Sequence, residues 1–262
     1  MDSNLDDIDA VFLDLDGTIY LGGDLIPGAL DFLDRCDVRG IRRFFLSNNS
    51  SRSVSQYLNK LSSMGIPATE SDVLLSTHDL LSWLGMNEVC EVWLVGTKGM
   101  REMLEASAIN TRSKNPEYVV VGYDTEISYD KIATAAIHLH RGVKLVASHP
   151  DMVCPSPEGG LPDTGAYLAM FEATTGVRPV HICGKPQPGM IQHKIEELGL
   201  ITERCAMVGD RLYTDMAMAT RAGTKGILVL SGEATMEDVE QLSAGAEQMP
   251  DLIVESVADL LR

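Results

Sequence analysis

Short apolar segments alternate along this chain with longer segments in which apolar residues recur every three or four positions. The short segments are rich in Val, Ile, Leu and Phe without strict alternation, which is typical of strands buried on both faces. The longer segments have the spacing of amphipathic helices. This order predicts an α/β fold built on a largely parallel sheet. The predicted strands are residues 8–14, 41–46, 91–95, 117–122, 143–147, 179–183, 205–209 and 226–230.

Glycine and proline mark several of the predicted helix boundaries. Pro27 suits the first turn of a helix that ends before Gly40, and Gly65 ends another helix that begins near Ser53. Segment 148–163 is rich in Pro and Gly, so we expect a long loop, which is either functional or a plain connector. Further helices are predicted near residues 97–107, 128–141, 164–175, 188–198, 213–222 and 234–244, and residues 251–261 are predicted as a strand and a helix.

The composition indicates a globular protein with an acidic surface. The 262 residues are 45% hydrophobic and 23% charged, and 21 Lys and Arg residues against 38 Asp and Glu residues give a net charge of −17. Such a surface repels nucleic acid and anionic membranes, so we expect neither as a partner. A phosphorylated substrate would need local positive charge, supplied by a metal ion and a few basic side chains.

The cysteines and the N-terminus favour a cytoplasmic protein. The 5 cysteines are scattered and form no Cys-x-x-Cys motif, which argues against a zinc site and a disulfide framework. The acidic N-terminus lacks the basic and apolar regions of a signal peptide. No apolar run approaches the roughly 20 residues needed to cross a membrane.

Polar residues follow four of the predicted strands. Because ligands bind beyond the carboxyl ends of the strands in open α/β sheets, we expect these residues to converge. They are Asp14 and Asp16 after the first strand, Ser47, Asn48 and Asn49 after the second, Lys185 after residues 179–183, and Asp210 and Asp215 after residues 205–209.

Each group has a chemical role if the substrate is a phosphate ester. Asp14 can attack phosphorus, and Asp16 can protonate the leaving oxygen and then activate water. Ser47 and nearby backbone N–H groups can donate to phosphoryl oxygens, and Lys185 can offset the negative charge. Asp210, together with Asp14, supplies the hard oxygen ligands that suit Mg²⁺.

Each residue also has a plain structural interpretation. Asp14 belongs to an Asp-x-Asp-Gly sequence that is common in solvated turns. Ser47 and Asp210 can cap the helices that follow them, and a lysine such as Lys185 is usually a surface residue. Asp215 can pair with Lys185, bind metal through water, or act as a first-turn helix carboxylate. The order of the groups on successive strand ends favours the chemical interpretation.

The four groups resemble the four motifs of the haloacid dehalogenase-like hydrolases, and more narrowly those of the NagD-type sugar phosphatases and 4-nitrophenylphosphatases. The resemblance covers nearly the whole chain and implies a Rossmann-like core, residues 1–78 and 181–262, with an inserted α/β cap domain, residues 79–180. The matching segments are Asp14-Leu-Asp-Gly-Thr-Ile-Tyr, Ser47-Asn-Asn-Ser, Gly184-Lys-Pro-Gln-Pro and Gly209-Asp-Arg-Leu-Tyr-Thr-Asp.

The resemblance assigns a role to each matching residue. It implies that Asp14 is the nucleophile, that Asp16 is the acid/base, and that Ser47 and Lys185 bind the phosphate. True dehalogenases lack the second aspartate, so the presence of Asp16 argues for phosphatase chemistry.

The resemblance also implies a metal site and further substrate contacts. Asp14, Asp210 and the backbone carbonyl of Asp16 match the Mg²⁺ ligands of the family. Asn48 and Asn49 extend the second motif, and Asn49 is the better placed to reach substrate or loop backbone.

Two segments depart from the family pattern. Residues 76–78 read Ser-Thr-His where relatives have small residues, so His78 lies either at the cleft entrance or on a hinge helix. Residues 161–166 carry Asp163 where relatives have a glycine-rich sequence. This acid could disfavour acidic substrates or bind a hydroxyl group.

We therefore expect a Mg²⁺-dependent phosphatase that hydrolyses small phosphomonoesters, such as sugar phosphates or nucleotides, through an aspartyl-phosphate. Two alternatives remain open: a phosphotransferase with an acceptor other than water, and a phospho-accepting signalling module. The expected partner is a small phosphorylated metabolite. Cap-mediated dimers in the family make a homodimer plausible.

Overall fold

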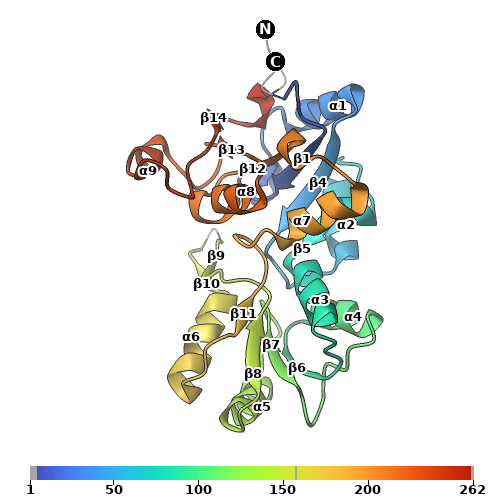
Figure 1. Cartoon of the computed structure of the whole chain (residues 1–262), viewed down its shortest axis with the longest axis vertical. Helices are drawn as coiled ribbons and strands as arrows, with labels where there is room; N and C mark the ends of the chain where they lie inside the picture. The colour runs from blue at the N-terminus through green and yellow to red at the C-terminus, as the bar shows by residue number, and fades with distance from the viewer. Residues whose placement is uncertain (1–4, 157, 261–262) are drawn as a thin grey trace. The chain divides into compact units, whose positions relative to one another are not determined.

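A computed structural model describes residues 5–156 and 158–260 (Figure 1). The chain divides into two compact units. The first unit comprises Met1–Ser47, Leu58–Leu74 and Lys185–Arg262, and the second comprises Asn48–Tyr57 and Leu75–Gly184. The assignment of a core and a cap with boundaries at residues 79 and 180 stays a prediction.

The first unit is built on a sheet with the strand order β14-β13-β12-β1-β4-β5, in which the strands from β14 to β4 pair in parallel. All five residues of β1 are buried, as expected for a central strand covered on both faces. The chain winds outward from β1 in both directions, so the strand order reverses there, where ligands bind in such folds. The strands are β1 (Ala10–Asp14), β4 (Arg42–Ser47), β5 (Val73–Leu75), β12 (Cys205–Gly209), β13 (Lys225–Val229) and β14 (Leu252–Val254).

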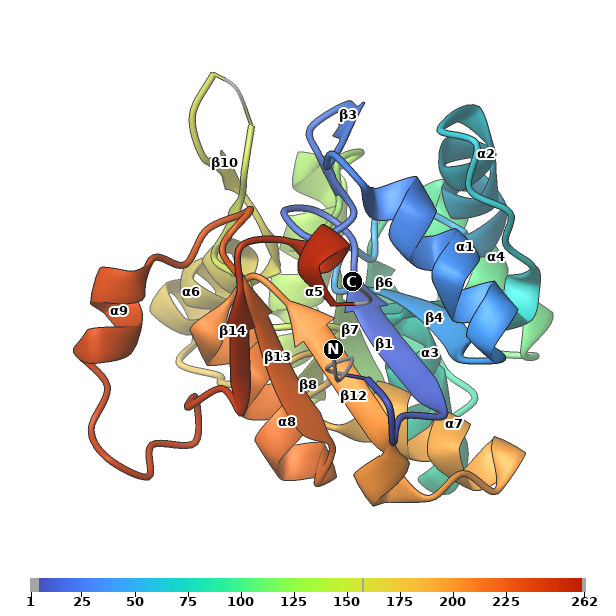
Figure 2. The same cartoon turned by 90° about the horizontal axis from the view of Figure 1, so that it is seen from above.

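Helices cover both faces of this sheet (Figure 2). Helices α7 and α8 pack on the face where the rings of Phe12 and Phe44 stack with centroids 5.1 Å apart, and α1 lies on the other side. A small antiparallel hairpin that was not predicted, β2 (Tyr20–Leu21) with β3 (Asp24–Leu25), follows β1. The helices are α1 (Ala29–Arg39), α7 (Gly189–Leu198), α8 (Ala217–Ala222) and α9 (Met236–Glu240), while α2 (Val54–Ser63) runs across a boundary between the units.

The second unit has a parallel sheet of its own, with the order β11-β8-β7-β6. Side chains alternate across it: Val120 packs with α3 and α4, whereas Val119 and Val121 pack with α5 and α6. The strands are β6 (Val92–Val95), β7 (Tyr118–Val121), β8 (Lys144–Ala147) and β11 (His181–Ile182), and the helices are α3 (Ser76–Met86), α4 (Lys98–Ala106), α5 (Tyr129–His140) and α6 (Thr164–Thr175).

The fold confirms the predicted α/β class with parallel sheets and differs from the expected elements in a few places. Strand β5 was not predicted, and helix α3 was expected only in the interpretation that places His78 on a hinge helix. Segment 148–163 is not an irregular loop throughout, because β9 (Val153–Cys154) pairs antiparallel with β10 (Leu161–Pro162); its Pro157 lies outside the described residues. The predicted C-terminal helix is a short 3₁₀ turn, Val257–Asp259, and residue 261 is outside the described range. No helix among the described residues is long and apolar enough to cross a membrane.

Candidate active site

Asp14 ends β1, where the chain turns sharply. Its side chain is mostly buried, with 8% of its surface exposed. Gly17 makes the turn with φ of 87°, and its N–H donates to the carbonyl of Tyr20 at 2.7 Å. Asp16 lies on this turn and is exposed. The turn therefore separates the two carboxylates, leaving Asp14 among buried groups and Asp16 facing solvent.

Lys185 lies between two aspartates of the first unit. Its Nζ donates to Asp14, and to Oδ1 of Asp215 at 2.7 Å. Only 4% of Lys185 is exposed, and burial alone would lower the pKa of its ammonium group. The two carboxylates outweigh burial and raise this pKa above its ordinary value, so the ammonium stays charged. This arrangement confirms one of the alternatives expected for Asp215, its pairing with Lys185.

Asp210 brings a further carboxylate to the same place. Ligand oxygens of Asp14, Asp210 and Asp215 all lie within 4.8 Å of one another. The Oδ2 atom of Asp210 accepts a hydrogen bond from the N–H of Glu233 at 2.8 Å, whereas its buried Oδ1 has no hydrogen-bond partner among the described residues. Burial, followed by repulsion from Asp14 and Asp215, raises the pKa of Asp210 to about 8.

This cluster fits a divalent cation. One ammonium group, that of Lys185, faces three carboxylates, so the aspartates carry more negative charge than the lysine balances. The buried Oδ1 of Asp210, which has no hydrogen-bond partner in the described part of the chain, is an oxygen that a cation could take as a ligand. Mg²⁺ prefers oxygen ligands of this kind.

Three glycines leave room for these carboxylates. A Cβ atom on Gly17 would lie 2.3 Å from Oδ2 of Asp210, and one on Gly232 would lie 2.1 Å from the same atom. A Cβ atom on Gly209 would lie 2.4 Å from Oδ2 of Asp215. Any larger residue at these positions would displace a carboxylate.

The residues of the second motif divide between the two units. Ser47 ends β4, beside β1 in the first unit. Asn48 belongs to the second unit, where its Nδ2 donates to both carboxylate oxygens of Asp151 at 3.2 Å. The Oδ1 atom of Asn49 accepts from the backbone N–H of Ser51 at 3.0 Å, which forms a local turn. The expected substrate contacts of Ser47, Asn48 and Asn49 stay predictions.

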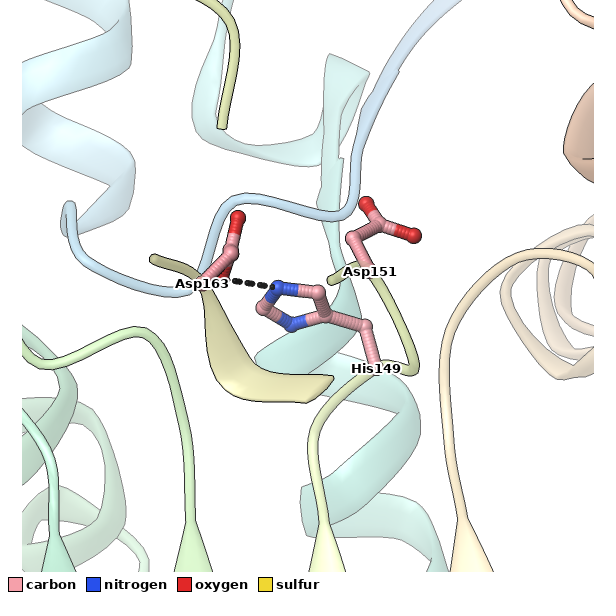
Figure 3. A group of neighbouring side chains, drawn as sticks. All are labelled: His149, Asp151 and Asp163. Carbon is pink, nitrogen blue, oxygen red and sulfur yellow. Dashed lines mark hydrogen bonds and ion pairs between the residues drawn. The ribbon is translucent and has the colours of Figure 1, made fainter. Parts of the chain in front are cut away.

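A second polar cluster, made of His149, Asp151 and Asp163, lies in the second unit (Figure 3). The fully buried ring of His149 is held between Ser148 Oγ, 2.9 Å from Nδ1, and Asp163 Oδ1, 2.9 Å from Nε2. Asp163 also caps α6 by accepting from the N–H of Thr164. These bonds give Asp163 a structural role, and the effect on substrates considered from the sequence stays a prediction.

His78 lies in the first turn of α3. Its Nδ1 accepts a hydrogen bond from the backbone N–H of Leu75 at 3.0 Å, which caps the start of the helix. This contact supports the interpretation of His78 as a helix residue. The interpretation as a residue of a cleft entrance stays untested.

Comparisons with known proteins agree on one family. A family model described as haloacid dehalogenase-like hydrolase matches residues 11–110, and one described as HAD-hydrolase-like matches residues 182–260. The chain is 34% identical over 255 residues to an acid sugar phosphatase of Staphylococcus aureus, which covers 96% of this chain and 97% of the relative.

Solved structures of phosphatases are similar to this chain over nearly its full length. A 4-nitrophenylphosphatase from Thermotoga maritima has a TM-score of 0.92 and 39% identity, covering 99% of this chain and 98% of that one. A glycerol phosphate phosphatase from Mycobacterium tuberculosis, solved in complex with magnesium, has a TM-score of 0.91 and 27% identity, covering 100% of this chain and 79% of that one.

Proposed function

We propose a Mg²⁺-dependent reaction through an aspartyl-phosphate for this chain. The chain belongs to the haloacid dehalogenase-like hydrolases and is a phosphoric monoester hydrolase of the NagD type. One observation carries the proposal. The buried Lys185 bridges Asp14 and Asp215, beside the unpartnered Oδ1 of Asp210. This arrangement at the end of the central strand supports the proposed roles of Asp14 as the nucleophile, Lys185 as the phosphate-binding cation and Asp210 as a metal ligand.

The reaction has two steps. In the first, a carboxylate oxygen of Asp14 attacks phosphorus, and the bond from phosphorus to the ester oxygen breaks as Asp16 protonates the departing alcohol. In the second, Asp16 takes a proton from water, the resulting hydroxide attacks phosphorus, and the bond to Asp14 breaks to release phosphate. The exposed position of Asp16 lets it meet both the leaving alcohol and the incoming water.

Negative charge is the main obstacle to attack by a carboxylate on a phosphate ester. Lys185 offsets the charge of Asp14 and would bind a phosphoryl oxygen, while Asp215 holds the ammonium in place. Ser47 would donate a further hydrogen bond to the phosphoryl group. Mg²⁺ supplies positive charge when it is bound by Asp14, Asp210 and the backbone carbonyl of Asp16.

We propose that the natural substrate is a small phosphorylated metabolite, with sugar phosphates as the first class to test. The acid sugar phosphatase and glycerol phosphate phosphatase relatives support this class. We further propose that Asn48 and Asn49 contact the substrate, that the protein is cytoplasmic, and that it forms a homodimer. We expect segment 148–163 to influence substrate choice, so exchanging it with that of a relative should reorder preferences in a substrate panel.

The test is hydrolysis of 4-nitrophenyl phosphate with Mg²⁺ and with a chelator. We expect activity only with the metal, loss of activity in Asp14→Asn, and slow turnover with retained metal binding in Asp16→Asn. Asp31→Asn, which changes an exposed acid on α1, is the matched control. Equal rates for wild type and Asp14→Asn would refute the assignment of the nucleophile.

Two further measurements separate the alternatives. Product analysis with added sugars or nucleosides identifies a phosphotransferase by the new ester that it forms. A phosphoprotein that persists for hours without release of phosphate identifies a signalling module. For the proposed phosphatase we expect inorganic phosphate as the product in both experiments.

A further inference from the structure

The first turn of α3 contacts residues at two of the points where the chain crosses from one unit to the other. The Oγ of Ser76 donates to the carbonyl of Asn48 at 2.6 Å, and a carboxylate oxygen of Asp79 accepts from the N–H of Gly184 at 2.8 Å. Asn48 follows Ser47 directly, and Gly184 precedes Lys185 directly. One helical turn is therefore bonded to the immediate neighbours of both residues expected to bind phosphate.

The Gly184 position leaves little freedom for its peptide group. Its φ of 69° favours glycine, and an added Cβ atom would lie 2.7 Å from Oδ1 of Asn48, 2.8 Å from the carbonyl of Ser148 and 2.9 Å from Cβ of Ser76. Atoms from three separate segments thus enclose Gly184. The carboxylate of Asp79 supplies the hydrogen bond that orients its N–H within this enclosure.

Asp79 is an unusual acceptor for this bond because it is buried. Only 7% of it is exposed, and burying a carboxylate is costly unless hydrogen bonds or charges compensate. Its place in the first turn of α3 offers one compensation, the favourable interaction of a negative charge with a helix N-terminus. The bond to Gly184 is the second, and it links the carboxylate to the residue before Lys185.

We propose that Asp79 is a positioning residue for phosphoryl transfer, which acts by fixing the peptide that precedes Lys185. The inference rests on the proposed function, in which Lys185 meets both Asp14 and the phosphoryl group. Because Lys185 is held by Asp14 and Asp215, a change in the path of its backbone moves the ammonium away from one or both of them. Asp79 itself needs no contact with the substrate.

Two substitutions separate this role from a helix-stabilising charge. Asp79→Asn keeps an oxygen that can accept from Gly184 and removes the charge, whereas Asp79→Glu keeps the charge and moves the acceptor by one methylene group. We expect Asp79→Asn to retain kcat/KM within about 3-fold, and Asp79→Glu to lower it by about 10- to 100-fold, since misplacement by about 1 Å costs about that much.

The measurements are kcat and KM for 4-nitrophenyl phosphate well below the unfolding temperature, with circular dichroism to verify folding. Asp130→Asn, an exposed acid in the first turn of α5, is the matched control and should behave as wild type. If Asp79→Glu does not fold, Asp79→Ala, which removes the acceptor without adding bulk, replaces it and should show the same loss.

The outcomes are distinct. Full activity in the variants that move or remove the acceptor would overturn the proposal, and so would an equal loss in Asp79→Asn, because the charge and not the acceptor would then matter. Wild-type protein that does not hydrolyse phosphate esters would instead refute the proposed function.

Discussion

Gly232 offers a sharp test of the carboxylate cluster, because it faces Asp210 at very short range. A Cβ atom at this position would lie 2.1 Å from Oδ2 of Asp210, whereas ordinary contact begins at 3.4 Å. In Gly232→Ala these atoms must separate by about 1.3 Å, the difference between the two distances. The backbone of Gly232 has no positive φ, so the effect of the substitution is steric.

The displacement should disturb the metal site more than the fold. Asp210 is held by the N–H of Glu233 at 2.8 Å, and the same short segment carries Gly232, so the new methyl group and this bond oppose each other. We expect an overpacking cost of about 1–3 kcal/mol in the free energy of unfolding. We expect kcat/KM to fall by about 100-fold, the usual effect of moving a catalytic group by about 1 Å.

The assay is hydrolysis of 4-nitrophenyl phosphate over a range of Mg²⁺ concentrations. The concentration needed for half-maximal activity should rise in Gly232→Ala. Gly23→Ala is the matched control, because a Cβ atom at Gly23 has no described neighbour within 4 Å and its φ is not positive. A folded Gly232→Ala protein with wild-type kcat/KM and Mg²⁺ dependence would refute the reasoning.

Three other predictions concern charge, backbone and thiol chemistry. Lys185→Met leaves buried carboxylates unpaired, so it should lower kcat/KM by about 10²–10³-fold and lower the free energy of unfolding by about 3–5 kcal/mol. Hydrolysis assays and urea unfolding measure the two effects, and wild-type stability would contradict this prediction. Gly85→Ala in α3 should raise the free energy of unfolding by about 0.5–1 kcal/mol. Gly65 has a φ of 77°, so Gly65→Ala should lower the free energy of unfolding by about 1 kcal/mol. Equal effects of the two substitutions would show that φ does not determine the sign of the change. Burial raises the pKa of Cys36 to about 12, so native protein at pH 8 should be alkylated at the exposed Cys90 and not at Cys36. Alkylation of Cys36 should become faster as the pH rises toward 12. Mass spectrometry of labelled peptides measures both rates, and fast labelling of Cys36 at pH 8 would contradict the prediction.

The parallel strands were predictable because burial on both faces requires continuous apolar residues, as in β1. Strand β5 and the extent of helix α3 were exceptions, because β5 has only 3 residues and runs directly into α3 with no Gly or Pro between them to mark a boundary. The β9–β10 hairpin was missed because each strand has only two residues and the segment is rich in Pro and Gly.

For the site, the strand-end rule was enough to expect that Asp14, Lys185 and Asp210 meet. The sequence left three roles open for Asp215; the bond from Lys185 confirms pairing, its place in the first turn of residues Leu212–Met216 agrees with a second role, and contact with a metal through water stays a prediction. The bonds between Asp79 and Gly184 and between His149 and Asp163 had no sequence signal. They depend on how distant segments fold against one another, and spacing along the chain does not encode that.

The order of segments along the chain has a consequence for synthesis on the ribosome. Strand β1 is made first and can pair with β4 early, but its other neighbour, β12, is translated only after the whole second unit. The long stretch Leu75–Gly184 carries nearly all of the second unit, so that unit can fold while one side of β1 still lacks its partner. A nascent chain of this protein must therefore keep an apolar strand edge from aggregating until its last third emerges.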